Sequence, residues 1–103
     1  MIGIEIKFNY WLPQTTQKGK KTKNFKELTQ MLTRDLKKLA KYKRGWLILI
    51  DYYSIIHNKK EWQKFIEETI RHSNCGCLKK TLNAYYLSPK QKKAITYKGV
   101  QAL

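Results

Sequence analysis

The chain has 103 residues, with 22 Lys and Arg against 7 Asp and Glu, and a formal net charge of +15. This length fits one domain, residues 1–103, and excludes two independent cores. Hydrophobic residues make up 42% of the sequence and aromatic residues 13%, which excludes a disordered basic tail. No apolar run approaches the roughly 20 residues that cross a bilayer, so we expect no membrane partner.

Alternating residues predict a first β-strand. Apolar side chains occupy every even position from Ile2 to Phe8, which is the period of two that indicates a strand. One face of this strand is apolar, so we expect the other face, which carries Glu5 and Lys7, to point into something more polar. Pro13 ends this segment, and residues 14–23 form a polar, lysine-rich loop.

The next segment predicts a helix over residues 25–42. Its start has a candidate capping box, Asn24 with Glu27, in which each side chain satisfies a backbone N–H of the first turn. Apolar residues follow at helical spacing. They are Phe25, Leu28, Leu32, Leu36 and Leu39.

A continuous apolar run, Trp46–Ile50, lies between Gly45 and Asp51. Such a run is typical of a central parallel strand that is buried on both faces. Asn58 and Glu61 repeat the Asn-x-x-Glu start and predict a second helix that ends near residue 72.

Two further extended runs, residues 81–87 and 93–97, are separated by a loop long enough for a hairpin. The predicted order is therefore β-α-β-α-β-β in a small mixed α/β domain. The first two strands are expected to be parallel, because a crossover helix joins them.

The charge favours an anionic partner, and nucleic acid, either DNA or RNA, is the leading class. The basic groups expected to meet phosphates lie in the polar loop, on the first helix and in the hairpin. They are Lys18, Lys20, Lys21, Lys23, Lys37, Lys38, Lys41, Lys90, Lys92 and Lys93.

Cysteine usage predicts a cytoplasmic protein. Two cysteines, Cys75 and Cys77, are too few for a disulfide framework, and the N-terminal residues have no secretory-signal pattern. Together with His72 they offer three soft ligands, whereas a structural zinc site takes four. We therefore expect no zinc.

The strand Gly3–Phe8 carries a Glu-x-Lys pair, the helix with Asp35 follows a basic loop, and the run ending at Asp51 comes next. This order resembles the second half of a PD-(D/E)xK nuclease domain, which is the core of restriction endonucleases. The resemblance covers residues 3–51. It implies that Glu5 is a metal-binding acid, that Lys7 is the catalytic lysine, and that the cofactor is Mg²⁺.

The superfamily places another metal-binding aspartate before the Glu-x-Lys strand, but the residues before Glu5 include no acid. Mg²⁺ prefers more than one anionic oxygen. Asp51 is the candidate second ligand, although it is expected at a strand end rather than beside Glu5. Alternatively, a second protein chain or a homodimer completes the site. Asp35 is expected to face solvent or to pair with a neighbouring lysine.

Several functions remain open on the sequence. The chain is either a component of a metal-dependent DNA nuclease or a nucleic-acid-binding remnant of one. Alternatively, it is a small basic ribonuclease toxin that resembles the RelE kind, or a basic adaptor or inhibitor that docks on an acidic protein surface.

Overall fold

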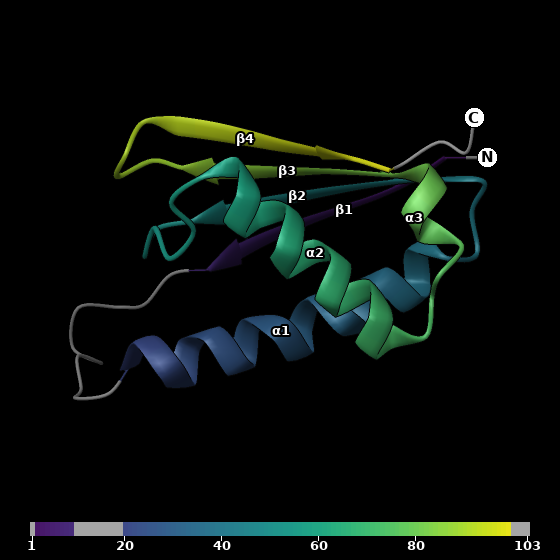
Figure 1. Cartoon of the computed structure of the whole chain (residues 1–103), viewed down its shortest axis with the longest axis horizontal. Coiled ribbons are helices and arrows are strands. Elements are labelled where there is room, and N and C mark those ends of the chain that lie inside the picture. Colours follow the sequence, from purple (N-terminus) through teal and green to yellow (C-terminus); the bar gives the residue numbers. More distant parts are fainter. Residues whose placement is uncertain (1, 10–19, 100–103) are drawn as a thin grey trace.

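The computed structural model describes residues 2–9 and 20–99, and it describes side chains within residues 2–9 and 26–99 (Figure 1). The elements are β1 (Ile2–Asn9), α1 (Lys20–Leu39), β2 (Arg44–Asp51), α2 (Lys59–Ser73), α3 (Leu78–Thr81), β3 (Leu82–Ser88) and β4 (Lys93–Lys98). The mixed α/β class and the β-α-β-α-β-β order are confirmed, and the short helix α3 is an addition that the sequence did not predict.

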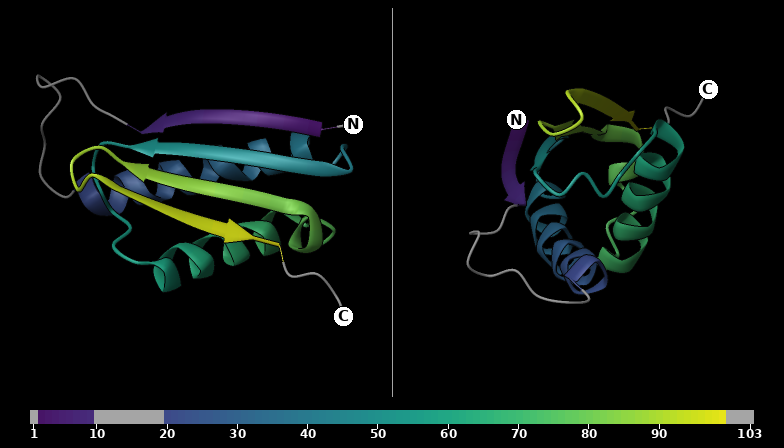
Figure 2. Two further views of the ribbon diagram at one scale, coloured as in Figure 1. Left: turned by 90° about the horizontal axis from the view of Figure 1, so that it is seen from above. Right: turned by 90° about the vertical axis from the view of Figure 1, so that its left-hand side faces the viewer.

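The strands form one sheet in the order β1-β2-β3-β4. β1, β2 and β3 are parallel, as predicted for the first two, and β4 returns antiparallel to β3. The two long helices, α1 and α2, lie on the same face of this sheet (Figures 1 and 2). We call this the helix-covered face. The other side, on which none of the described helices packs, is the open face.

The hydrophobic core lies between the helices and the sheet. The predicted leucine face of α1 is confirmed, since Leu28, Leu32 and Leu36 are fully buried. From α2, Trp62 and Ile66 are also fully buried. α1 packs beneath β1 and β2, whereas α2 packs beneath β4.

The helix starts were predicted with different success. Asn58 caps α2, because its side-chain oxygen accepts the Glu61 backbone N–H at 2.9 Å, and the Glu61 carboxylate accepts the His57 N–H at 2.9 Å. The capping box at Asn24 and Glu27 is wrong: α1 already begins at Lys20, so both residues lie inside the helix.

The prediction that the central strand is buried on both faces is also wrong. Leu47 and Leu49 of β2 are fully buried under the helices. Trp46, Ile48 and Ile50 are half-buried. They point to the open face, where neighbouring side chains cover them but no described helix does.

β1 turns its apolar residues away from the helices. Its apolar side chains lie on the open face, and between 51% and 63% of the surface of each remains exposed. Glu5 and Lys7 lie on the helix-covered face and are half-buried. Gly3 is needed there, because a Cβ at this position would lie 2.5 Å from Cδ2 of Tyr42.

Within the described ranges, no helix is long and apolar enough to cross a membrane.

Candidate functional site

Positive charge dominates the described surface. Every lysine and arginine whose side chain is described is exposed, except the half-buried Lys7. The exposed carboxylates among these residues are Glu27, Glu61 and Glu68. Asp35 and Asp51 are buried, so two of the few negative charges lie inside the protein and compensate little of the surface charge.

One basic stripe runs along the outer face of α1. Lys26, Gln30, Arg34, Lys37 and Lys41 are all exposed and follow one another at intervals of three or four residues. This spacing places the first four on one side of the helix, and Lys41 follows just beyond its C-terminal end. From Lys26 to Lys37 the helical part of the stripe is about 17 Å long, at 1.5 Å per residue. We call these residues the α1 stripe.

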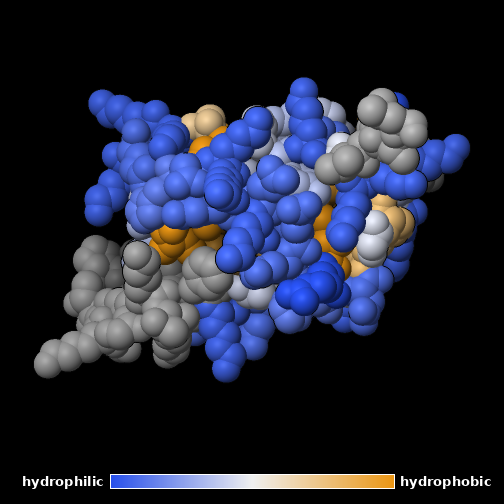
Figure 3. Space-filling model, in the orientation of Figure 1, coloured by the Kyte–Doolittle hydropathy of each residue, from blue (hydrophilic) through white to orange (hydrophobic). Residues whose placement is uncertain are grey.

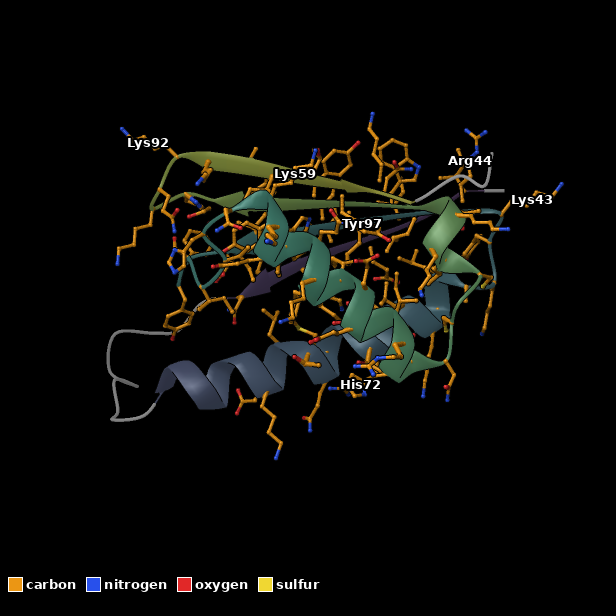
Figure 4. The ribbon with its side chains drawn as sticks, viewed as in Figure 1. Lys43, Arg44, Lys59, His72, Lys92 and Tyr97 are labelled. Carbon is orange, nitrogen blue, oxygen red and sulfur yellow. The ribbon has the colours of Figure 1, made fainter. Side chains whose placement is uncertain are left out.

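A shallow groove borders the α1 stripe where α1 approaches the end of α2. It is lined by Lys26, Thr29, Gln30, Thr33, Arg34 and His72. Figure 4 shows His72 at the end of α2 that lies next to α1. The lining contains cationic and neutral polar side chains and no carboxylate, so it presents hydrogen-bond donors to an anion without a repelling charge.

A second open groove lies over α2 and α3, but its charge is mixed. Its lining residues are Lys60, Gln63, Lys64, Glu67, Glu68, Arg71 and Lys79. Figure 3 shows the hydrophilic surface over this side of the molecule, with small hydrophobic areas between the polar side chains. Because two carboxylates line this groove, it suits phosphate less well than the groove beside α1.

The structure divides the lysines that were predicted to meet nucleic acid into separate groups. Lys37, Lys38 and Lys41 lie together at the C-terminal end of α1 and just beyond it. Lys90, Lys92 and Lys93 lie at the β3–β4 hairpin, near the opposite edge of the sheet, and Lys92 points away from the body of the molecule (Figure 4). Lys93 donates a hydrogen bond to the backbone carbonyl of His57.

The loop lysines need a correction, because α1 includes three of them. Lys20, Lys21 and Lys23 belong to the first turns of α1 rather than to a loop. Their side chains, and Lys18 entirely, lie outside the described residues.

The Glu-x-Lys strand contacts α1 through an acidic residue, Asp35, that was not predicted to lie there. Lys7 Nζ lies 3.3 Å from Oδ1 of Asp35, whose side chain is only 2% exposed. The other oxygen, Oδ2, has no hydrogen-bond partner among the described residues. Burial raises the pKa of Asp35, and the neighbouring Glu5 carboxylate raises it further, while the hydrogen bond and charge of Lys7 lower it.

Asp35 is the acid that the structure brings to Glu5 and Lys7, and it does not face solvent. Its lysine partner is also on β1 rather than on its own helix. A sequence signal existed: Leu28, Leu32, Asp35 and Leu39 follow the helical spacing of a buried face. An acidic residue in a lysine-rich helix was instead expected to face solvent or to pair with a neighbouring lysine.

Asp51 is not part of this cluster. Asp51 pairs with Asn9 in the β1–β2 register, whereas Glu5 pairs with Leu47. This offset of four positions separates the two carboxylates by roughly 13 Å along the strands.

Both Asp51 oxygens are already occupied by hydrogen bonds. Oδ1 accepts from Asn9 Nδ2 and Tyr53 N, each at 2.9 Å. Oδ2 accepts from Ile55 N at 3.0 Å and from the Tyr86 hydroxyl at 2.6 Å. Burial raises the pKa of Tyr86, and its hydrogen bond to the carboxylate raises it further. Asp51 therefore organises the chain that follows β2.

The two cysteines differ in their exposure and are not bonded to each other. Cys75 is buried and Cys77 is exposed, and both are free thiols. Across the described part of the chain, no three His, Cys, Asp or Glu side chains form a cluster that could hold a metal ion.

The chain was compared with protein-family models, curated proteins and solved structures, and none of them matches it.

Proposed function

We propose that this protein binds nucleic acid through the phosphate backbone, and that the contact surface is the α1 stripe with its adjoining groove. The observation that carries the proposal is the distribution of charge there. Three cations lie on one side of α1 and a fourth, Lys41, lies just beyond its end, and the groove beside them contains polar donors without a carboxylate.

The physical basis is the release of counterions from the nucleic acid. Each cation that neutralises a phosphate frees condensed counterions, so affinity falls steeply as salt rises. A long, rigid helix holds its cations in a fixed array and lowers the entropy cost of ordering them. Binding of this kind reads the backbone and carries little sequence specificity.

The test measures the salt dependence of binding to a 20-base-pair DNA duplex and to a 20-nucleotide RNA by fluorescence anisotropy. The variant Lys26→Gln/Arg34→Gln/Lys37→Gln/Lys41→Gln removes four cations from the α1 stripe. If all four meet phosphates, the slope of log K against log salt falls in magnitude by about three to four units on the duplex.

A charge-matched control removes four exposed lysines elsewhere, with Lys59→Gln/Lys60→Gln/Lys90→Gln/Lys92→Gln. This variant tests the hairpin lysines and is expected to keep nearly the whole slope. Equal losses in the two variants would mean that the protein attracts polyanions by net charge alone, and the proposal for the α1 stripe would then be wrong.

A second candidate function is metal-assisted cleavage of the bound strand at Glu5, Lys7 and Asp35. The buried Asp35 Oδ2 favours it, because this acceptor has no partner among the described residues and lies in the electrostatic reach of Glu5. Two carboxylates with waters are an adequate donor set for Mg²⁺, which would activate a water or neutralise phosphate charge. Lys7 would hold Asp35 in its ionised form.

The experiment combines a metal-binding and a cleavage measurement. Wild type is expected to bind Mn²⁺ in an electron paramagnetic resonance titration and to nick supercoiled plasmid in Mg²⁺ or Mn²⁺. Glu5→Gln should lose both, whereas its affinity for the 20-base-pair duplex remains unchanged. If wild type does not bind Mn²⁺, the cleavage function is wrong and only the nucleic-acid-binding function remains.

A further inference from the structure

The open face of the sheet carries a largely apolar surface. It consists of the even-numbered residues 2–8 of β1, 44–50 of β2 and 94–98 of β4, with the odd-numbered residues 83–87 of β3. Figure 2 shows this face from above, with both long helices behind the sheet.

The strand register arranges the open face in rows. Phe8, Ile50, Leu87 and Ala94 form one row across all four strands, and every member is apolar. The next row is Ile6, Ile48, Tyr85 and Thr96. At strand spacings of about 4.8 Å and 3.3 Å per residue, the whole face covers roughly 500 Å² with its polar residues included, and its apolar part lies within the range of surface patches that are often functional.

The charged residues of the open face have one sign. They are Arg44 and Lys98, both exposed and both near the same end of the sheet. In Figure 4 the Arg44 side chain extends away from the helices. None of the residues that define the open face is a carboxylate, so this surface has no acid that could pair with these cations.

This charge pattern decides between three occupants. A second copy would bring an identical face and another +15 net charge, with no carboxylate on the face for Arg44 or Lys98. Nucleic-acid bases stack on aromatic planes, but here Trp46 and Tyr85 stack on each other at 5.7 Å and the rest is mostly aliphatic. A protein with an apolar patch and flanking carboxylates is complementary both to the apolar residues of the open face and to its two cations.

We propose that the open face is the docking surface for an acidic protein partner, whose apolar side chains cover β1 and β2 and whose carboxylates pair with Arg44 and Lys98. This surface lies opposite the helices and is separate from the proposed nucleic-acid contact. Both partners can therefore be bound at once, and the protein would link an acidic polypeptide to nucleic acid.

The test selects 12-residue peptides from a random display library on the full chain, with counter-selection on Ile4→Thr/Ile6→Thr. The counter-selection removes peptides that respond only to net charge, because both proteins carry the same charge. The expected peptides combine large apolar residues with Asp or Glu. In anisotropy measurements they should bind Ile4→Thr/Ile6→Thr at least 10-fold more weakly than wild type.

A second pair of variants tests the role of charge. Arg44→Gln/Lys98→Gln should weaken the selected peptides at least fivefold, whereas the charge-matched Lys59→Gln/Lys60→Gln should change binding less than twofold. Thermal unfolding of each variant checks that the fold is kept. The quadruple variant of the α1 stripe should bind the peptides like wild type even if the nucleic-acid proposal fails.

Four outcomes would overturn the proposal. The first two are a selection that recovers neutral or basic peptides and one that enriches no peptide. The third is a dimer in sedimentation that Ile4→Thr/Ile6→Thr dissociates, which would assign the face to a second copy. Loss of RNA binding on Trp46→Leu, with the peptides unaffected, would assign it to bases.

Discussion

On the helix-covered face of the sheet, the side chains of β2 and β3 are closed off from water, and Leu47, Leu49, Leu82 and Ala84 are all fully buried. On the open face, the alternate residues of the same strands are only half-buried, and Arg44 is exposed. In β1 the difference is larger, because its polar residues face the helices and its exposed isoleucines lie on the open face. The apolar content of a face therefore does not by itself measure its contribution to stability.

The difference follows from what covers each face. Burial stabilises by roughly 25 cal/mol for each Å² of apolar surface removed from water, and that removal is complete only beneath α1 and α2. Apolar residues on the open face contribute less to the isolated chain. Their stabilising contribution is expected only when a partner removes them from water.

The largest expected effect comes from a pair of tryptophans that lie on opposite faces. Trp62 is fully buried, packs against Tyr86 and donates its indole N–H to the carbonyl of Ala84 at 3.2 Å. Trp62→Ala should lower the free energy of unfolding by about 3–5 kcal/mol. Trp46→Ala on the open face should cost about 1 kcal/mol, mainly its stacking on Tyr85.

Urea denaturation followed by circular dichroism measures both changes. Similar losses in the two variants would show that something covers the open face of the isolated chain, and the comparison between the faces would have to be abandoned.

The sequence predicted the elements well and the faces poorly. The leucine spacing of α1 and the Asn58 cap of α2 specify local structure, so they could be found without tertiary information. Which face of β1 turns inward depends on what lies beneath it. Gly3 fits under Tyr42, and Lys7 meets Asp35, and both partners lie at least 28 residues further along the chain.

A second, smaller effect is expected at the polar group that joins the ends of β1, β2 and β3. Asp51→Asn keeps the shape of the side chain but replaces one acceptor by a donor, which would face the Ile55 N–H or the Tyr86 hydroxyl. We expect a loss of about 2–4 kcal/mol, because hydrogen bonds to a charged group are among the stronger ones and a buried donor would lose its partner.

Two tyrosines that are neighbours in β3 make the matched control. Tyr86→Phe removes the acceptor of the Ile56 N–H and one donor to Asp51, and should cost about 1–2 kcal/mol. Tyr85→Phe, on the open face, should change stability by less than about 0.5 kcal/mol. If the two variants lost the same free energy of unfolding in urea melts, the hydrogen bonds around Asp51 would not contribute to stability as proposed.

The candidate site was predictable only in part, for a related reason. The Glu-x-Lys pair identifies two residues that share a face of one strand, and the structure keeps them together. The acid that joins them comes from α1, so its identity depends on how α1 lies beneath β1. Asp51 was selected because it ends an adjacent strand, but the register places it beside Asn9 and its four hydrogen bonds fix it there.

The smallest expected effect, and the one most specific in its pH dependence, concerns Asp35. Its pKa in the folded protein is raised above the ordinary value of 3.8, chiefly by burial. As pH rises above that value, the unfolded chain releases its proton first, so this carboxyl contributes stability at low pH that is lost as pH rises through the folded pKa. Asp35→Asn removes the titration, so its stability relative to wild type should increase between pH 4 and pH 7.

At pH 7 the two proteins should differ by no more than about 1 kcal/mol, because Asn loses the pairing with Lys7 but also the cost of burying a charge. Lys7→Met should raise the pKa of Asp35 further, since the hydrogen bond and charge that oppose the shift are gone. Urea melts across this pH range, with the Asp35 carboxyl followed by carbon-13 NMR, measure both effects. A stability difference that does not change with pH would mean that Asp35 is exposed to water. The contrast between the helix-covered face and the open face would then not apply to the polar residues of β1.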